Sequence, residues 1–211
     1  MACKAPAACL VGLVKASFLA VIALASSGLS GALLADEAAD LAAIRALYAK
    51  IDAAESAKTE TITFALKDDP LEGTITRRSY EGGLSAIQVS YTAGDHGGSD
   101  QSFYFKGEDL FFIFTEDSSW QFAEGSTDEK PKTMDTLTQS RYYVKGGKII
   151  QVLQRSATTN AGKELDELIA KVENKKVQDD KKGPALLKRA AALLKIKTKE
   201  QALKYFSTEG L

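Results

Sequence analysis

The chain has little of the side-chain chemistry on which most metal centres and nucleophilic sites depend. Among its 211 residues there are two cysteines, one histidine and one tryptophan. Both cysteines, Cys3 and Cys9, lie ahead of the first acidic residue, Asp36, in a segment with the layout of a secretory signal. Once that segment is removed, no thiol remains for a disulfide, a nucleophile or a thiolate metal site. We therefore expect no cofactor and no bound metal.

Residues 1–35 carry the three parts of a signal peptide. Lys4 and Lys15 supply the positive start, residues 16–25 are mostly apolar, and serine, glycine and alanine follow. A retained membrane anchor is the alternative, because residues 16–35 have no charge and approach the roughly 20 residues that a spanning helix needs. The serines and glycines favour the cleaved signal. The sequence thus predicts export, to the periplasm or the outside of the cell, with no transmembrane span after cleavage.

Charge is divided unevenly along the rest of the chain. Residues 36–170 contain 23 acidic and 14 basic side chains, whereas residues 171–211 contain 5 acidic and 11 basic ones. A basic segment of this kind is attracted to anionic surfaces such as phospholipid headgroups, although no specific nucleic acid is predicted. The side chains expected to contact such a surface are Lys181, Lys182, Lys188, Arg189 and Lys195. The simpler interpretation is that they form the solvated faces of helices attracted to the acidic part of the chain.

Hydrophobic periodicity predicts one helix followed by strands. Between Asp36 and about Ala54, apolar residues recur every three or four positions, at Leu41, Ile44, Leu47, Tyr48 and Ile51. Asp36 or Asp40 is expected to cap this helix. From Thr61 to Lys67 apolar and polar residues alternate, which is typical of a half-buried strand.

A weak internal repeat predicts β-hairpins. The sequence FYFKGEDL surrounds Gly107, YYVKGGKI surrounds Gly146, and a degenerate copy lies at Tyr80–Leu84. Glycine between β-forming residues supplies the positive φ that tight turns require. Three successive hairpins, with the strand near Thr61, predict an antiparallel meander of about six or seven strands.

The predicted strand that follows the turn at Gly107 is apolar on both faces. Simple alternation places Leu110, Phe112 and Phe114 on one face, with Phe111 and Ile113 on the other. The N-terminal helix would cover one face. The other would need the C-terminal helices, a partner chain or a ligand, and those helices are expected on either side of Gly183 and Pro184.

These patterns together predict an α+β protein. A helix packs on a curved antiparallel meander of about six or seven strands, and a C-terminal helical extension follows. The expected organisation is a signal peptide over residues 1–35, a helix-plus-sheet domain over 36–157 and a basic helical extension over 158–211.

Candidate catalytic groups lie at expected turns. His96 stands between Asp95 and Asp100 in the glycine-rich stretch GDHGGSD, which is typical of an exposed loop and not of a rigid triad. The carboxylates of Asp95 and Asp100 could bind Ca²⁺, but the spacing of calcium ligands found in an EF-hand is absent. Three acidic pairs, Asp68/Asp69, Glu116/Asp117 and Asp128/Glu129, are also expected in turns. We therefore predict no catalytic residue, and a hydrolase is the less favoured hypothesis.

Aromatic side chains on the predicted strands are the candidate ligand-binding residues. They are Tyr104, Trp120, Tyr142 and Tyr143. Exposed aromatic rings on a sheet stack on sugars or bases, or line an apolar site, although cross-strand pairs that stabilise the sheet are commoner.

The stretch from Ile44 to Arg155 resembles a group of exported bacterial proteins of unknown function. The likeness rests on the helix with Ile44 and Tyr48, the isolated Trp120, and the segments FYFKGEDLFFIF and RYYVKGGKIIQVL. It implies an N-terminal helix on an antiparallel meander and carries over no catalytic residue. We expect an exported, non-catalytic binding or structural protein of the cell envelope, with an unknown hydrophobic ligand or envelope protein as partner. The alternative is an adaptor that binds anionic surfaces through its lysine-rich C-terminal helices.

Overall fold

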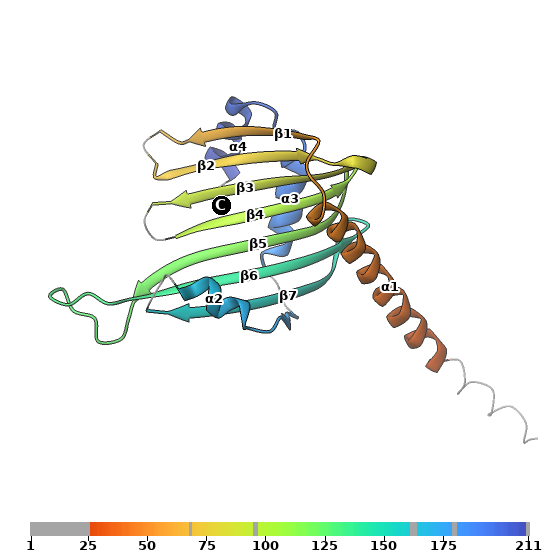
Figure 1. Cartoon of the computed structure of the whole chain (residues 1–211), viewed down its shortest axis with the longest axis horizontal. Helices are drawn as coiled ribbons and strands as arrows, with labels where there is room; N and C mark the ends of the chain where they lie inside the picture. Colours follow the sequence, from red (N-terminus) through yellow and green to blue (C-terminus); the bar gives the residue numbers. More distant parts are fainter. Residues whose placement is uncertain (1–25, 68, 95–96, 161–163, 179–180, 210–211) are drawn as a thin grey trace, which may run out of the picture. The chain divides into compact units, whose positions relative to one another are not determined.

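The computed structural model describes residues 26–67, 69–94, 97–160, 164–178 and 181–209 (Figure 1). The chain forms two compact units, Met1–Ala38 and Ala39–Leu211, and the second holds the whole sheet. Both cysteines, most of the predicted signal peptide, and the candidate residues Asp68, Asp95 and His96 lie outside the described residues.

The N-terminal helix, α1 (Ser26–Asp52), begins before the start expected at Asp36. Residues 32–35 are Ala, Leu, Leu and Ala, strong helix formers that continue the helix into the predicted signal segment, whereas residues 26–31, SSGLSG, have no such preference. Asp36 and Asp40 are therefore inside the helix and not at its start, and Asp40 instead accepts a hydrogen bond from Lys145 at 2.6 Å. The predicted apolar stripe is the face that packs on the sheet, with Ile44 and Ile51 buried.

Eight antiparallel strands form one sheet in which every strand pairs with its neighbours in the sequence. They are β1 (Lys58–Ala65), β2 (Leu71–Ser79), β3 (Leu84–Ala93), β4 (Gly97–Lys106), β5 (Asp109–Phe122), β6 (Thr133–Lys145), β7 (Lys148–Thr159) and β8 (Lys175–Lys176). The predicted α+β meander is confirmed, with one strand more than the upper expectation. The extra strand, β8, has two residues, too few to show an alternating pattern in the sequence.

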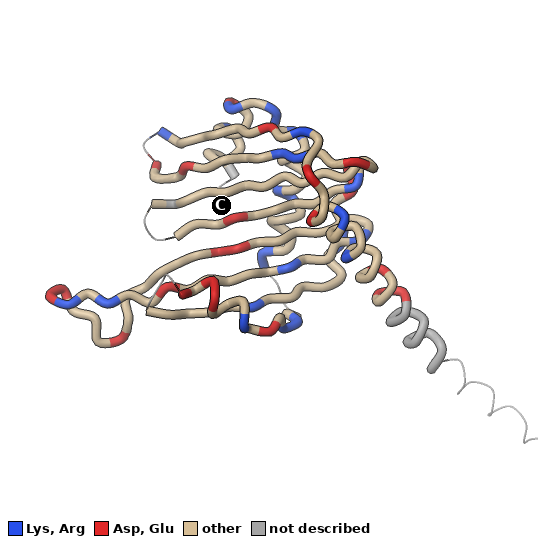
Figure 2. Tube along the Cα trace, in the orientation of Figure 1, with Lys and Arg blue, Asp and Glu red and all other residues tan. Residues whose placement is uncertain are grey.

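Glycine turns join the strands at the predicted places. Gly107 connects β4 to β5, and Gly146 and Gly147 connect β6 to β7, with φ of 64°, 55° and 74°. The degenerate copy forms the single-turn helix η1 (Glu81–Gly83) between β2 and β3. The longest turn region, residues 123–132, joins β5 to β6, extends beyond the sheet, and carries charges of both signs (Figures 1 and 2).

Two β-bulges correct the predicted faces. The register between β4 and β5 shifts so that Tyr104 pairs with Phe112 and Phe105 with Leu110, which leaves Phe111 as the extra residue. Phe111 and Phe112 consequently both pack toward α1, and Leu110 packs toward the opposite face with Ile113. The strict alternation expected for residues 110–114 is thus wrong at Leu110 and Phe111. The β6–β7 hairpin around Gly146 has the same kind of register shift, with Ile150 as its extra residue.

The C-terminal helices cover one face of the sheet, which we call the α3 face. Helix α3 (Gly183–Leu193) and helix α4 (Lys199–Glu209) lie behind the sheet in Figure 1. Their buried residues join the largest apolar cluster, which includes Phe64, Ile75, Val89, Phe103, Ile113, Tyr142, Leu186, Leu193 and Phe206. This apolar half of the face is therefore closed by the chain itself.

The opposite face, which we call the α1 face, is covered in two separate places. Residues 41–51 of α1 pack on Tyr104, Phe112 and Tyr143. The short helix α2 (Leu165–Ala170) packs near Leu137 and Ala157. Leu137 and Tyr143 are six positions apart on β6, and because alternate side chains of a strand share a face, both lie on this one. A polar strip between the two covers holds Glu116, Gln139, Arg141 and Arg155.

Candidate functional site

The four predicted ligand-binding aromatics separate into three locations. Tyr142 is fully buried on the α3 face, within the main core. Tyr104 and Tyr143 lie on the α1 face and pack against α1. Trp120 is far along β5, where its ring meets Phe122 edge-on at 5.4 Å between centroids. Only Tyr104 and Tyr143 therefore belong to one cluster.

A groove lies beside α1 on this face of the sheet. Its volume is about 240 Å³, and its lining residues are Ile44, Arg45, Tyr48, Phe112, Phe114, Arg141 and Tyr143. Helix α1 supplies one wall, and neighbouring positions of β5 and β6 supply the floor, because Phe112 pairs with Tyr143 and Phe114 with Arg141. The sheet register thus places three aromatic rings and a guanidinium side by side next to the helix.

Edge-on and tilted ring contacts hold the groove in shape. Tyr48 meets the rings of Tyr104 and Phe112 at 5.2 Å each, and Phe112 meets Tyr143 at 5.3 Å. Such pairs are worth about 0.5–1.5 kcal/mol each beyond the area they bury. Burial raises the pKa of Tyr104 to about 12, with the neighbouring Tyr48 as a further cause. Burial also raises the pKa of Tyr48, so both phenols are neutral hydrogen-bonding groups at neutral pH.

Two arginines lie over the aromatic floor. The Arg45 guanidinium is 5.4 Å from the ring centroid of Tyr143, and that of Arg141 is 5.0 Å from the ring of Phe114. Arg141 also donates to Asn174 Oδ1 at 2.9 Å. Burial lowers the pKa of Arg141, and the like charge of Arg155 lowers it further. The groove thus combines an apolar body with a positive margin.

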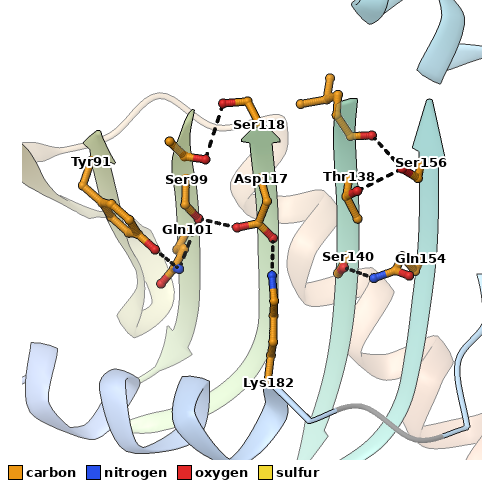
Figure 3. Close-up of polar contacts among 12 residues, drawn as sticks. Tyr91, Ser99, Gln101, Asp117, Ser118, Thr138, Ser140, Gln154, Ser156 and Lys182 are labelled. Atoms are coloured by element: carbon orange, nitrogen blue, oxygen red, sulfur yellow. Dashed lines mark hydrogen bonds and ion pairs between the residues drawn. The ribbon is translucent and has the colours of Figure 1, made fainter. Parts of the chain in front are cut away.

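A polar network lies on the α3 face beside the start of α3 (Figure 3). Gln101 donates to Tyr91 Oη and to Ser99 Oγ, each at 3.2 Å, and accepts from Arg189 at 2.7 Å. The Ser99 hydroxyl donates to Asp117 at 2.8 Å. Because these hydrogen bonds join Arg189 of α3 to side chains of the sheet, the network fastens α3 to the sheet, and we assign it a structural role. Hydroxyl and amide pairs continue it across β6 and β7, at Thr138/Ser156 and Ser140/Gln154.

The predicted anionic-surface residues do not all reach the surface. Lys181, Lys182, Lys188 and Lys195 are exposed. Lys182 forms an ion pair with Asp117 at 3.0 Å, as expected if the basic helices are attracted to the acidic sheet. Arg189 is only 8% exposed and donates to Gln101, so the structure places this side chain beneath α3 and away from solvent.

The described acidic residues do not converge on one point. Glu116 and Asp117 are adjacent on β5 and point to opposite faces, where Glu116 accepts from Gln139 and Asp117 from Ser99. Asp69 accepts from the backbone N–H of Leu71 at 2.8 Å, which stabilises its turn. Within the described ranges, no three histidine, cysteine or acidic side chains gather closely enough to hold a metal ion.

Sequence reasoning identified the aromatic floor in part and missed the arginines. Tyr143 was expected at a site, and Arg141 two residues earlier shares its face of β6 by simple alternation. Arg45 follows Ile44 of the apolar stripe, so its place at the edge of the helix contact was available from the helical period. The pairing of β5 with β6, which joins these groups, was not.

The chain matches no protein-family model, and neither the curated proteins nor the solved structures contain a significant match to it. Separately, none of the helices in the described part of the chain is both long enough and apolar enough to cross a membrane.

Proposed function

We propose that this chain is an exported, non-catalytic binding protein of the cell envelope that takes a hydrophobic ligand in the groove beside α1. The observation that carries the proposal is the groove itself, with its floor of Phe112, Phe114 and Tyr143. Binding sites for small molecules are typically concave, mostly apolar and marked by a few polar groups. The signal-like residues 1–35 support export.

The α3 face is a less suitable place for such a ligand, because helices of the same chain already cover its apolar half. The apolar half of the α3 face is filled by α3 and α4, whose Leu186, Leu193 and Phe206 are buried there. The groove on the α1 face retains open volume between side chains that remain partly exposed, including Phe114 and Tyr48. A ligand therefore enters the groove without displacing a helix.

Binding of the neutral apolar fluorophore N-phenyl-1-naphthylamine tests the proposal. We expect saturable binding to the full chain and roughly 10- to 100-fold weaker binding to Phe114→Ala, because losing a buried aromatic contact is worth roughly 1.5–3 kcal/mol. Phe122→Ala is the matched control, since Phe122 is the same residue type on the same strand and is 64% exposed. Unchanged affinity in Phe114→Ala, or a loss confined to Phe122→Ala, would overturn the proposal.

A second candidate function, an adaptor for anionic surfaces, is favoured by the exposure of Lys181, Lys188 and Lys195. The apolar side of α3 is already packed on the sheet, so contact with a lipid surface would be electrostatic alone. Vesicles of acidic phospholipid should then bind the chain at low salt and release it near 1 M salt, where the Debye length is about 3 Å. Equal binding to neutral vesicles would exclude this function.

A further inference from the structure

The margin of the groove carries positive charge without a paired carboxylate. In the described part of the chain, neither Arg45 nor Arg141 forms an ion pair with an acidic side chain. The acceptors of Arg141 are two neutral amides, on Asn174 and Gln139. Arg45 is exposed, and its guanidinium lies over the face of the Tyr143 ring.

This arrangement is unusual for a segment that is acidic as a whole. Arg155 stands near Arg141 and donates to the same Gln139 at 2.8 Å. The carboxylate that acts on the pKa of Arg141 is Glu116, which accepts from Gln139, and Asp52 lies beside Tyr48. Two guanidiniums and one carboxylate therefore leave the polar strip positive, and Arg45 adds a third guanidinium from α1, although residues 36–170 contain 23 acidic and 14 basic side chains.

We infer that the ligand of the groove is an anionic amphiphile, whose apolar body lies on Phe112 and Phe114 and whose carboxylate or phosphate head lies between Arg45 and Arg141. The inference rests on the proposed function, because it assigns the chemistry of the same groove. Guanidinium groups bind planar or tetrahedral oxyanions through paired N–H donors, and such charge-assisted bonds are stronger than neutral ones. A volume of about 240 Å³ holds part of a chain or one ring, so the rest of the ligand remains outside.

Charge complementarity selects this class over its neutral and cationic relatives. A neutral amphiphile would gain the apolar contacts and leave the guanidiniums hydrated. A cationic one would place like charges together at the margin, which costs free energy. For amphiphiles of equal chain length, we therefore expect the affinity to be highest for the anionic one, lower for the neutral one and lowest for the cationic one.

The test compares three probes of one chain length on the full chain at low salt. They are dodecanoate, dodecan-1-ol and dodecyltrimethylammonium, each kept below the concentration at which it aggregates and measured by displacement of N-phenyl-1-naphthylamine. We expect dodecanoate to bind about tenfold more tightly than dodecan-1-ol. Arg45→Gln and Arg141→Gln should each reduce that preference severalfold, because each weakens dodecanoate more than dodecan-1-ol, and Arg45→Lys should retain part of it.

Arg78→Gln is the matched control. Arg78 lies on the same face and donates to Gln88, but it does not line the groove. Equal affinity of the wild-type chain for dodecanoate and dodecan-1-ol, with Phe114→Ala weakening both, would overturn the inference and leave the proposed function standing. Binding of neither probe would overturn both, and is the result expected if a chain segment or a second copy of the protein fills the groove. A preference lost equally in Arg78→Gln would also overturn the inference.

Discussion

At the scale of single residues, Tyr104 connects the groove to the behaviour of the protein in alkali. In the folded chain the Tyr104 phenol keeps its proton until about pH 12, whereas in an unfolded chain it releases the proton near pH 10. The folded state therefore binds more protons between these values, so stability is unaffected below pH 10 and falls as the pH rises from 10 to 12.

We expect one tyrosine of the folded protein to titrate near pH 12, as followed by the ultraviolet absorbance of tyrosinate. Tyr104→Phe should remove one tyrosine's share of the absorbance change near pH 12 and lessen the loss of stability above pH 10, while Tyr48, whose pKa burial also raises, continues to titrate above pH 10. An absorbance change near pH 12 that is as large in Tyr104→Phe as in the wild-type chain would show that the Tyr104 hydroxyl is not buried as described.

The turn glycines support a second prediction at this scale. Gly147 has a φ of 74°, and an added Cβ would meet no atom within 4 Å, so a substitution there changes backbone conformation and not packing. Gly147→Ala should lower the free energy of unfolding by about 1 kcal/mol in urea denaturation. Gly147→Asn should recover part of the loss, because asparagine tolerates positive φ. Equal stabilities for the three proteins would contradict the assigned turn.

Residue patterns alone predicted some members of the candidate site and not others. The aromatic repeat indicated Tyr104 and Tyr143, and both pack against α1. The same repeat indicated Tyr142, which alternation sends to the opposite face and into the core. A list of aromatic residues could not separate these cases, because the separation depends on which face each helix covers.

At the scale of elements, α3 is held to the sheet by two basic residues with different surroundings, Lys182 just before its start and Arg189 within it. Arg189 is 8% exposed and donates to Gln101, whereas Lys182 is exposed and pairs with Asp117. Removing a buried charged donor costs more than removing an exposed ion pair, which is worth about 0–1 kcal/mol. These residues thus distinguish a structural contact from a surface one.

We expect Arg189→Ala to lower the free energy of unfolding by about 2–4 kcal/mol and Lys182→Ala by less than about 1 kcal/mol. Urea denaturation measures both, and Gln101→Ala should reduce the cost of Arg189→Ala when the two are combined. A larger effect for Lys182→Ala than for Arg189→Ala would contradict the assignment of Arg189 to the buried side of α3.

The elements themselves were largely predictable, and their irregularities were not. Alternation and glycine turns indicated β1 to β7 as a meander. The bulges at Phe111 and Ile150 follow from pairing across strands, where one residue more on β5 and on β7 must be accommodated. Because Phe111 and Phe112 are equally apolar, nothing in their order shows which of them is the extra residue.

At the scale of the sheet and its covering helices, the two faces differ in how completely they are covered. The α3 face buries its apolar half under helices from the same chain, and its polar half is occupied by the network around Gln101. The α1 face is covered in two places, and a groove remains beside α1. The sequence left open which cover the second face would receive, because a long-range choice among helices leaves no local pattern.

The central claim is that the groove beside α1 is a ligand site, and the isotope-labelled methyl groups of the full chain test it most directly. Ile44 lines the groove, whereas Leu193 is buried under α3 on the other face. On titration with dodecanoate, we predict a saturable change in the NMR shift of the Ile44 methyl group and none for Leu193. A titration that moves Leu193 and leaves Ile44 unchanged, or that moves neither, would contradict the account.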